Sequence, residues 1–207
     1  MDNEFTLTVK GREIAVRTCE GLFSPLAPDR GTLAMLRHAG IGEGDRVLDL
    51  GCGWGYVSLY ACLSGAQRVD ACDADERAVR CTNDNLVRAG FAPCAVVSDG
   101  LDEIPARDFT CILSNPPYQS DFAVAKKFIA QSHAHLAMGG RLVMVTKRRQ
   151  WYKNRLIAVF GGVRIAQDDG YFVFLAEKRK KKEEHKETAN RLSKKLARKY
   201  GKDGRQI

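Results

Sequence analysis

The segment Asp49-Leu50-Gly51-Cys52-Gly53-Trp54-Gly55 follows a short apolar run and decides the fold of this chain. The run at 47–50 predicts a buried strand, and residues 55–64 predict a helix that begins at the last glycine. Glycines between a strand and a helix allow a tight turn and the close approach of a ligand. Tyr56 stands where the pattern G-x-G-x-x-G needs its last glycine, which disfavours a dinucleotide pyrophosphate, and the sequence has no G-x-x-x-x-G-K-[ST] segment.

Strand and helix signals alternate on both sides of this turn. The predicted order is a hairpin at 5–17, a loop at 18–31 and a helix at 32–39, then strands and helices at 47–50, 55–64, 69–72, 75–89, 95–97, 109–113, 121–137, 142–145 and 148–160, and a last hairpin at 163–166 and 171–175. Gly139-Gly140 is expected to end the helix at 121–137. The alternation predicts an α/β, mostly parallel sheet with helices on both faces and an antiparallel edge. Ligands of such sheets bind beyond the carboxyl ends of the strands.

An aspartate follows or ends each of the first three strands of this sheet. Asp49 precedes the glycines, where its carboxylate would repel a pyrophosphate but attract an amino group, as in a cofactor such as S-adenosylmethionine. Asp73 is placed to accept hydrogen bonds from two ribose hydroxyls, and Asp99 from an adenine amine. Each aspartate alone is equally typical of a helix N-cap. Three in succession beside the glycine turn favour a cofactor site.

The fourth strand ends in Ser114-Asn115-Pro116-Pro117-Tyr118. The two prolines fix the backbone and remove two N–H donors. This leaves the Asn115 carboxamide and the Pro116 carbonyl as acceptors beside the Tyr118 ring, on which a planar base would stack. Acceptors arranged around a tetrahedral nitrogen favour the transition state for methylating a ring-conjugated amine. Alternatively, the prolines form a rigid loop that only ends the strand.

Together these motifs resemble class I S-adenosylmethionine-dependent methyltransferases with a Rossmann-like fold. Asn115 to Tyr118 are similar to the motif of the branch that methylates adenine N6, guanine N2 or glutamine side-chain amides. More narrowly, the chain resembles the MTS family, in particular the small-subunit ribosomal RNA guanine-N2 methyltransferases of the C type. The resemblance covers about residues 5–177 and includes the segments Gly21–Ser24, Asp29–Thr32, Val159–Val163 and Gly170–Phe174.

The resemblance implies a seven-stranded sheet with one antiparallel edge strand, preceded by the hairpin. It implies that Asn115, Pro116, Pro117 and Tyr118 form the catalytic set. The cofactor contacts that it implies are Asp49, Gly51, Cys52, Gly53, Gly55, Asp73, Asp99 and Asn115, with Phe23 and Thr32 covering the methionine end. We expect one methyltransferase domain over 1–177, with the hairpin within 1–20. Larger family members carry a second, degenerate domain ahead of the catalytic one, which this sequence does not contain.

The net charge of +8 lies in the carboxyl-terminal segment. Residues 177–207 hold 13 basic and 5 acidic residues, whereas residues 1–176 hold 20 of each. A basic run is typical of a polyanion-binding segment, although many such runs are only solvated. We expect residues 178–207 to form a helical or disordered tail that contacts RNA phosphates. Lys147, Arg148, Arg149, Lys180, Lys181 and Lys182 are the candidate RNA contacts, with the first three on the rim of the site.

Three functions remain open at this point. The first is methylation of an exocyclic amine of an RNA base, most consistent with guanine N2 of ribosomal RNA, with adenine N6 of RNA or DNA as a variant. The second is methylation of a glutamine amide in a protein, although residues 1–30 lack the helical recruiting domain usual in that family. The third is a non-catalytic RNA-binding module with a relict cofactor pocket.

Composition restricts the cellular setting and the kinds of site. Seven cysteines without a Cys-x-x-Cys pair argue against a disulfide framework and a zinc site and favour the reducing cytoplasm. No apolar run approaches the roughly 20 residues that span a bilayer. The amino terminus lacks a basic region followed by an apolar stretch, so we expect no secretion, no membrane partner and no metal.

Overall fold

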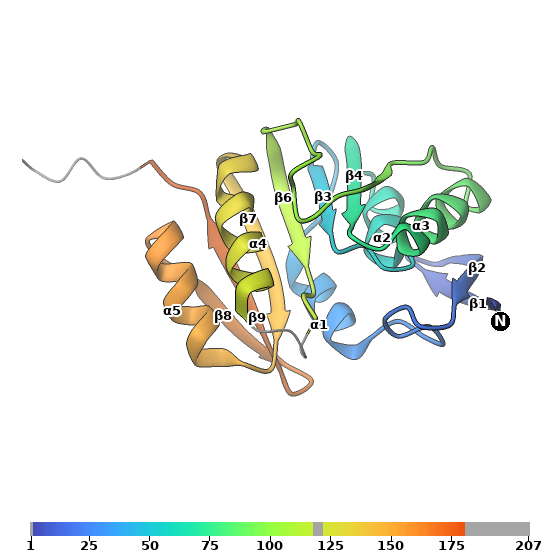
Figure 1. Cartoon of the computed structure of the whole chain (residues 1–207), viewed down its shortest axis with the longest axis horizontal. Coiled ribbons are helices and arrows are strands. Elements are labelled where there is room, and N and C mark those ends of the chain that lie inside the picture. The colour runs from blue at the N-terminus through green and yellow to red at the C-terminus, as the bar shows by residue number, and fades with distance from the viewer. Residues whose placement is uncertain (1, 118–121, 181–207) are drawn as a thin grey trace, which may run out of the picture.

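The computed structural model of the 207-residue chain describes residues 2–117 and 122–180 (Figure 1). Seven strands form one sheet in the spatial order β5-β4-β3-β6-β7-β9-β8. Their bounds are β3 (Arg46–Leu50), β4 (Arg68–Asp73), β5 (Ala95–Val97), β6 (Phe109–Ser114), β7 (Leu136–Thr146), β8 (Arg164–Asp168) and β9 (Tyr171–Glu177). The strands β5, β4, β3, β6 and β7 run parallel. The predicted mostly parallel sheet is therefore confirmed.

Five helices cover the two faces of the sheet: α1 (Arg30–Ala39), α2 (Tyr56–Leu63), α3 (Glu76–Arg88), α4 (Phe122–His135) and α5 (Arg149–Phe160). Successive residues of a strand face opposite sides, so Leu48 and Leu50 of β3 pack with α4 and α5, whereas Val47 packs with α1 and α2. All three side chains are at most 1% exposed. Burial on both faces explains why the strands are apolar throughout instead of alternating.

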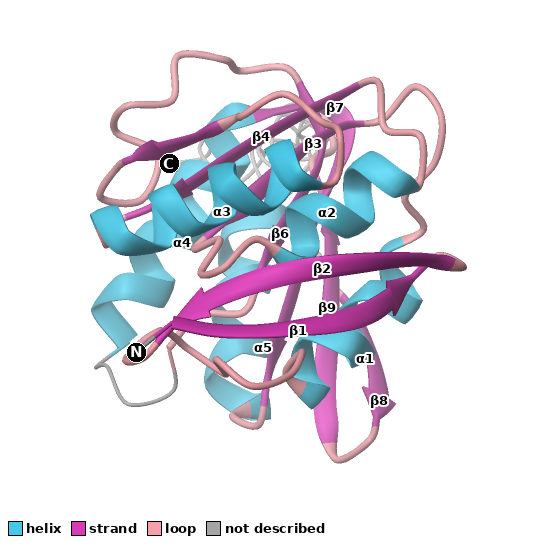
Figure 2. Cartoon of the chain, turned by 90° about the vertical axis from the view of Figure 1, so that its right-hand side faces the viewer, coloured by secondary structure: helices cyan, strands magenta, loops and turns pink. Residues whose placement is uncertain are grey.

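The hairpin of β1 (Asp2–Val9) and β2 (Arg12–Cys19) forms a separate two-stranded sheet beside α2 and α3 (Figure 2). Asn85 of α3 ties it to the glycine turn. Its Oδ1 accepts from the Arg17 backbone N–H at 2.8 Å, and its Nδ2 donates to the carbonyls of Arg17 and Trp54 at 2.8 and 2.9 Å. The hairpin is therefore connected through Asn85 to the glycine turn.

Strand β9 lies between β7 and the edge strand β8 and runs antiparallel to both of them. The expectation of an antiparallel edge strand is thus wrong in position, because the last hairpin folds back and inserts its second strand. The reversal also sets where the chain leaves the sheet. Glu177, at the end of β9, pairs with Arg141, whereas Phe172, near its start, pairs with Thr146 at the end of β7. Strand β9 therefore ends at the edge of the sheet opposite the carboxyl ends of β6 and β7 (Figure 1).

Gly139 and Gly140 do not end a helix as predicted. Helix α4 ends at His135, and both glycines lie inside β7. The pairing of β6 and β7 is irregular here: Phe109 pairs with Leu136, but Cys111 pairs with Arg141. The extra residues of β7 bring the Gly140 backbone against the Phe109 carbonyl, where an added Cβ would lie 2.7 Å from that oxygen. The glycine pair is thus required by a bulge between strands.

We expect Gly140→Ala to lower the free energy of unfolding by about 2 kcal/mol, because the backbone of β6 must move to admit the methyl group. Urea unfolding measures this change. Gly162→Ala is the matched control, since its Cβ would meet nothing within 4 Å, and we expect its effect to stay within about 0.5 kcal/mol. Equal stability of the two variants would contradict the crowded geometry at β6.

Candidate functional site

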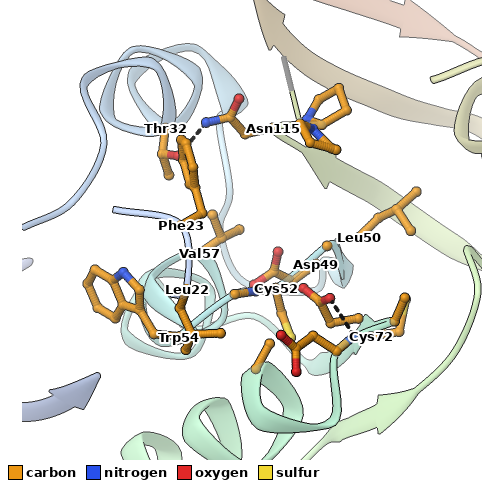
Figure 3. A pocket seen from close by; sticks show the side chains of 18 of the residues that line it. Leu22, Phe23, Thr32, Asp49, Leu50, Cys52, Trp54, Val57, Cys72 and Asn115 are labelled. Atoms are coloured by element: carbon orange, nitrogen blue, oxygen red, sulfur yellow. Dashed lines mark hydrogen bonds between the residues drawn. The ribbon is translucent and has the colours of Figure 1, made fainter. Parts of the chain in front are cut away.

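A cavity of about 370 Å³ opens at the carboxyl ends of β3, β4 and β6 (Figure 3). Residues that follow the three strands line it, together with the segment 21–32 from the other side. The glycine turn, Asp73, Asp99 and Asn115 all contribute, although the sequence spreads them over 67 residues from 49 to 115. The parallel strands therefore bring the predicted cofactor residues to one place.

The glycine turn has a backbone that other residues adopt only with strain. Gly51, Gly53 and Gly55 have φ angles of 82°, 57° and 91°. A Cβ on Gly55 would also lie 3.0 Å from the Thr82 Cα, because α2 begins directly against α3. Gly53 N–H donates to Asp73 Oδ2 at 3.0 Å, so the turn is held by the end of the neighbouring strand.

Asp49 is 2% exposed and lies beneath this turn. Its Oδ2 accepts from the backbone N–H and the hydroxyl of Ser58, at 3.0 and 2.7 Å, in the first turn of α2. Burial raises the pKa of Asp49 to about 7, against the hydrogen bonds from Ser58, which lower it, and nearby Asp73 raises it slightly further. A cation bound in the cavity would favour the ionised form of this carboxyl group.

Asp73 and Asp99 differ in how firmly they are held. Asp73 Oδ1 accepts from the Asp75 backbone N–H at 3.0 Å, so both of its oxygens face backbone donors and keep one lone pair each for a ligand. Asp99 has a side chain that is 80% exposed on the rim and pairs with Lys127 at 2.8 Å.

Cys52, 6% exposed, fills the turn, and its Sγ accepts from the Thr82 hydroxyl at 3.3 Å.

The charge of the cavity wall is one-sided. Five aspartates line it, namely Asp29, Asp49, Asp73, Asp75 and Asp99, and two of them, Asp75 and Asp99, pair with Arg77 and Lys127 outside the lining. None of the described residues that line it is Lys, Arg or His. Such a wall repels phosphates and attracts a cation. The cavity therefore fits a ligand that carries ammonium or sulfonium charge and hydroxyl groups, and not a pyrophosphate.

Asn115 lies at the far side of the cavity, immediately after β6. Its Nδ2 donates to Asp29 Oδ2 at 2.9 Å and to Thr32 Oγ1 at 3.0 Å (Figure 3 shows the latter bond). Both amide hydrogens are therefore occupied, and the orientation of the carboxamide is fixed with Oδ1 as its acceptor atom. Pro116 is buried and Pro117 exposed, and both line the cavity. Tyr118 lies outside the described residues.

Asp29 is a site residue that sequence reasoning missed. It is the N-cap of α1, where its Oδ2 accepts from the Thr32 backbone N–H at 2.9 Å, and the same oxygen accepts from Asn115. The sequence signal was the N-cap pattern of an aspartate three residues before Thr32. Its contact with Asn115, 86 residues away, depends on the packing of α1 against the end of β6.

The segment that carries Phe23 is held over the cavity mouth. Trp54 Nε1 donates to the Ser24 carbonyl at 3.1 Å, and Ser24 adopts a left-handed φ of 50°. The Phe23 side chain lies between Thr32 and Val57 in Figure 3 and is 50% exposed. Phe23 and Thr32 thus stand beside Asn115, and their predicted contact with the methionine end of a cofactor stays a prediction.

The candidate RNA contacts do not share one surface. Lys147, Arg148 and Arg149 follow β7 at the carboxyl edge, outside the cavity wall. Lys180 follows β9 and lies at the opposite edge of the sheet, because β9 runs antiparallel. Lys181 and Lys182 lie outside the described residues, as does nearly all of the predicted tail.

No three His, Cys, Asp and Glu side chains in the described part of the chain are grouped so that they could hold a metal ion. No helix in residues 2–117 and 122–180 is long and apolar enough to cross a membrane.

Comparison with curated proteins relates the chain to a set of ribosomal RNA methyltransferases. It is 29% identical over 181 residues to the ribosomal RNA small subunit methyltransferase C of Psychromonas ingrahamii, covering 83% of this chain and 50% of that protein. It is 32% identical over 161 residues to the protein of the same name from Pseudoalteromonas translucida, covering 75% and 47%. The chain therefore spans about half the length of these relatives.

A solved structure and a family profile agree with this relation. The structure of the T. Thermophilus 16S rRNA N2 methyltransferase RsmC, in complex with AdoMet and guanosine, superposes with a TM-score of 0.79 at 27% identity, covering 86% of this chain and 51% of that one. The profile of the family described as methyltransferase small domain matches residues 13–176, a range that runs from within β2 to within β9. The chain therefore belongs to the methyltransferase small domain family.

Proposed function

We propose that this protein is an S-adenosylmethionine-dependent N-methyltransferase that acts on an exocyclic amine of an RNA base, most specifically guanine N2 of ribosomal RNA in the cytoplasm. The observation that carries the proposal is the Asn115 carboxamide, oriented by Asp29 and Thr32 at the mouth of a wall of carboxylates. The relation to an enzyme solved with AdoMet and guanosine supports the same substrate class.

The residues of the cavity fit S-adenosylmethionine. The cofactor carries an ammonium and a sulfonium charge and no phosphate, which suits a wall with five carboxylates and no lining cation among the described residues. Asp49 beneath the glycine turn would attract the amino-acid portion, and Asp73 would accept from the ribose hydroxyls with the lone pairs that its backbone donors leave. When bound, the cofactor supplies an electrophilic methyl group on sulfur.

Asn115 and Pro116 orient the base amine that receives the methyl group. The two hydrogens of a base amine would be accepted by Asn115 Oδ1 and by the Pro116 carbonyl. Because the ring delocalises the lone pair of that nitrogen, the free base keeps the amine flat. Acceptors placed around a tetrahedral nitrogen instead stabilise the geometry in which the lone pair points at the methyl group. The amine proton is then lost to water.

The class of the acceptor is tested with radiolabelled cofactor. The full chain is incubated with ribosomal RNA, transfer RNA and the protein fraction from a strain that lacks this gene, and the labelled residues are identified by mass. We expect N2-methylguanosine from ribosomal RNA. Label only in protein glutamine or only as N6-methyladenosine would replace the proposal by the corresponding alternative.

Asp29→Ser separates the two roles of Asp29. Serine is as good an N-cap as aspartate, so the free energy of unfolding should change by less than about 0.5 kcal/mol. Its shorter side chain does not reach the Asn115 amide, so we expect turnover to fall on the order of 10- to 100-fold with an unchanged cofactor affinity. Measuring kcat, KM and urea stability of the variant tests this. Unchanged turnover would show that Asn115 is oriented without Asp29.

We also propose that the basic tail adds phosphate contacts from the far edge of the sheet. A truncation that tests this must leave Lys178 in place, because the backbone of Lys178 forms hydrogen bonds with Gly139 and Gly140 and belongs to the sheet. A chain that ends at Lys180 should bind RNA more weakly, with a shallower salt dependence, since each lost phosphate contact removes about 0.7 to 0.9 from the slope of log K against log salt. Cofactor affinity should not change. An unchanged salt slope would remove the tail from RNA binding.

A further inference from the structure

Three consecutive cations at the start of α5 are each seated over an aromatic ring. Lys147 Nζ lies 4.8 Å from the ring centre of Tyr171, the Arg148 guanidinium 5.1 Å from that of Phe122, and the Arg149 guanidinium 5.8 Å from that of Phe172. The Phe122 ring is itself stacked on Trp151, with centres 4.2 Å apart and planes 15° from parallel. Phe122 therefore contacts both Arg148 and Trp151, and we call these three residues the Arg148 stack.

These cations have no carboxylate partner among the residues that the structure describes. Other arginines of the same fold do: Arg37 pairs with Asp168, Arg68 with Asp108 and Arg141 with Asp45. Lys147, Arg148 and Arg149 are exposed, and the interactions that hold their charged groups are those with the rings beneath them. Their charge is therefore available to an anion, and their side chains are already ordered for it.

The Arg148 stack lies close to the candidate site. Strands β6 and β7 are parallel neighbours, and Ser114 pairs with Met144, so Asn115 is level with Val145. Strand β7 ends at Thr146, and Arg148 lies two residues beyond it, so its backbone is within roughly 15 Å of that of Asn115. Figure 1 shows the starts of α4 and α5 together at this edge, beside the end of β6.

The chemistry of the surface points to one kind of partner. The Arg148 guanidinium is exposed and lies over the Phe122 ring, and nucleobases of unpaired RNA stack on arginine planes and aromatic rings. Lys147 and Arg149 on either side can contact the phosphates of the same strand. We propose that the Arg148 stack binds an unpaired nucleobase next to the methylated nucleotide. That neighbouring position rests on the proposed function, whereas the stacking site itself does not.

The test separates stacking from charge. A fluorescently labelled 12-mer of oligoadenylate and an RNA of the same length that is abasic at every position are titrated with the full chain at several salt concentrations, without cofactor. Arg148→Lys keeps the charge but removes the flat face. Stacking on one base is worth roughly 5- to 150-fold in affinity, so we expect this variant to lose about tenfold on oligoadenylate. On the abasic strand its affinity and its salt slope should match those of the unchanged chain.

Two further variants complete the design. Phe122→Leu removes the ring beneath the guanidinium and should weaken oligoadenylate binding in the same selective way. Arg164→Lys, an exposed arginine on β8, is the matched control and should change neither affinity. Equal losses on both strands for Arg148→Lys, or no loss on either, would overturn the stacking site. Titration with S-adenosylmethionine and the methylation assay report separately on the proposed function, so the failure of one is distinguishable from the failure of the other.

Discussion

Asn115→Ala should lower methyl transfer by about 10²- to 10³-fold while the protein still binds S-adenosylmethionine within a few-fold of its normal affinity. The size of the effect follows from its place in the reaction, since a single preorganised polar group that acts in the transition state contributes about 10²- to 10³-fold. Alanine also removes the group that Asp29 and Thr32 hold in place, so no other described side chain takes over as the oriented acceptor.

Single-turnover kinetics with ribosomal RNA and calorimetric titration with the cofactor give the two quantities. Asn154→Ala serves as the control, because Asn154 is exposed on α5 and its side chain accepts a hydrogen bond from Gln150 in the same helix. It should leave both quantities unchanged. Normal turnover by Asn115→Ala would show that Asn115 takes no part in the reaction and would contradict the proposed hydrogen bond from the base amine to Asn115 Oδ1.

Asp49→Asn should weaken cofactor binding on the order of 100-fold at pH 8 and at the same time stabilise the cofactor-free protein. The asparagine oxygen can still accept from Ser58, so the fold is kept, but the negative charge that we propose attracts the cofactor's ammonium group is lost. In the unchanged protein, cofactor affinity should fall as the pH drops below about 7, because protonated Asp49 no longer attracts a cation. In Asp49→Asn this pH dependence should be absent.

The stability change has a defined sign. The pKa of Asp49 is raised from 3.8 to about 7 in the folded protein, so its contribution to stability is full below about pH 4 and is lost as the pH rises through 7. Asparagine has no such loss. The variant should therefore exceed the unchanged protein by up to about 4 kcal/mol in free energy of unfolding at pH 8, and by little at pH 4. Urea unfolding across this range measures the difference, with exposed Asp84→Asn as control. If the difference in free energy of unfolding between the two proteins did not vary with pH, the raised pKa of buried Asp49 would be contradicted.

Most of the fold could be predicted from the sequence because the strands are short, apolar and separated by clear turn and helix signals. The elements around the glycine turn lie within one or two residues of their predicted bounds. Gly139-Gly140 was misread because a glycine pair is typical both of a helix end and of a strand bulge. Only the contact of Gly140 with the carbonyl of Phe109, 31 residues earlier in the chain, distinguishes the two.

The candidate site was predictable where it depends on strand ends. Asp49, Asp73 and Asn115 meet because parallel strands end at a common edge, which the alternation of strands and helices already implies. Asp29 was not predictable, since its contact with Asn115 arises from where α1 packs. The placement of Lys180 at the opposite edge was not predictable either, because it follows from the insertion of β9 between β7 and β8.

The most direct test of the account is a crystal structure of the protein with S-adenosylhomocysteine and guanosine. The account predicts the sulfur over the glycine turn and the guanine N2 within hydrogen-bond distance of both Asn115 Oδ1 and the Pro116 carbonyl. A guanine bound elsewhere at full occupancy, or one that turns another edge toward Asn115, would contradict it.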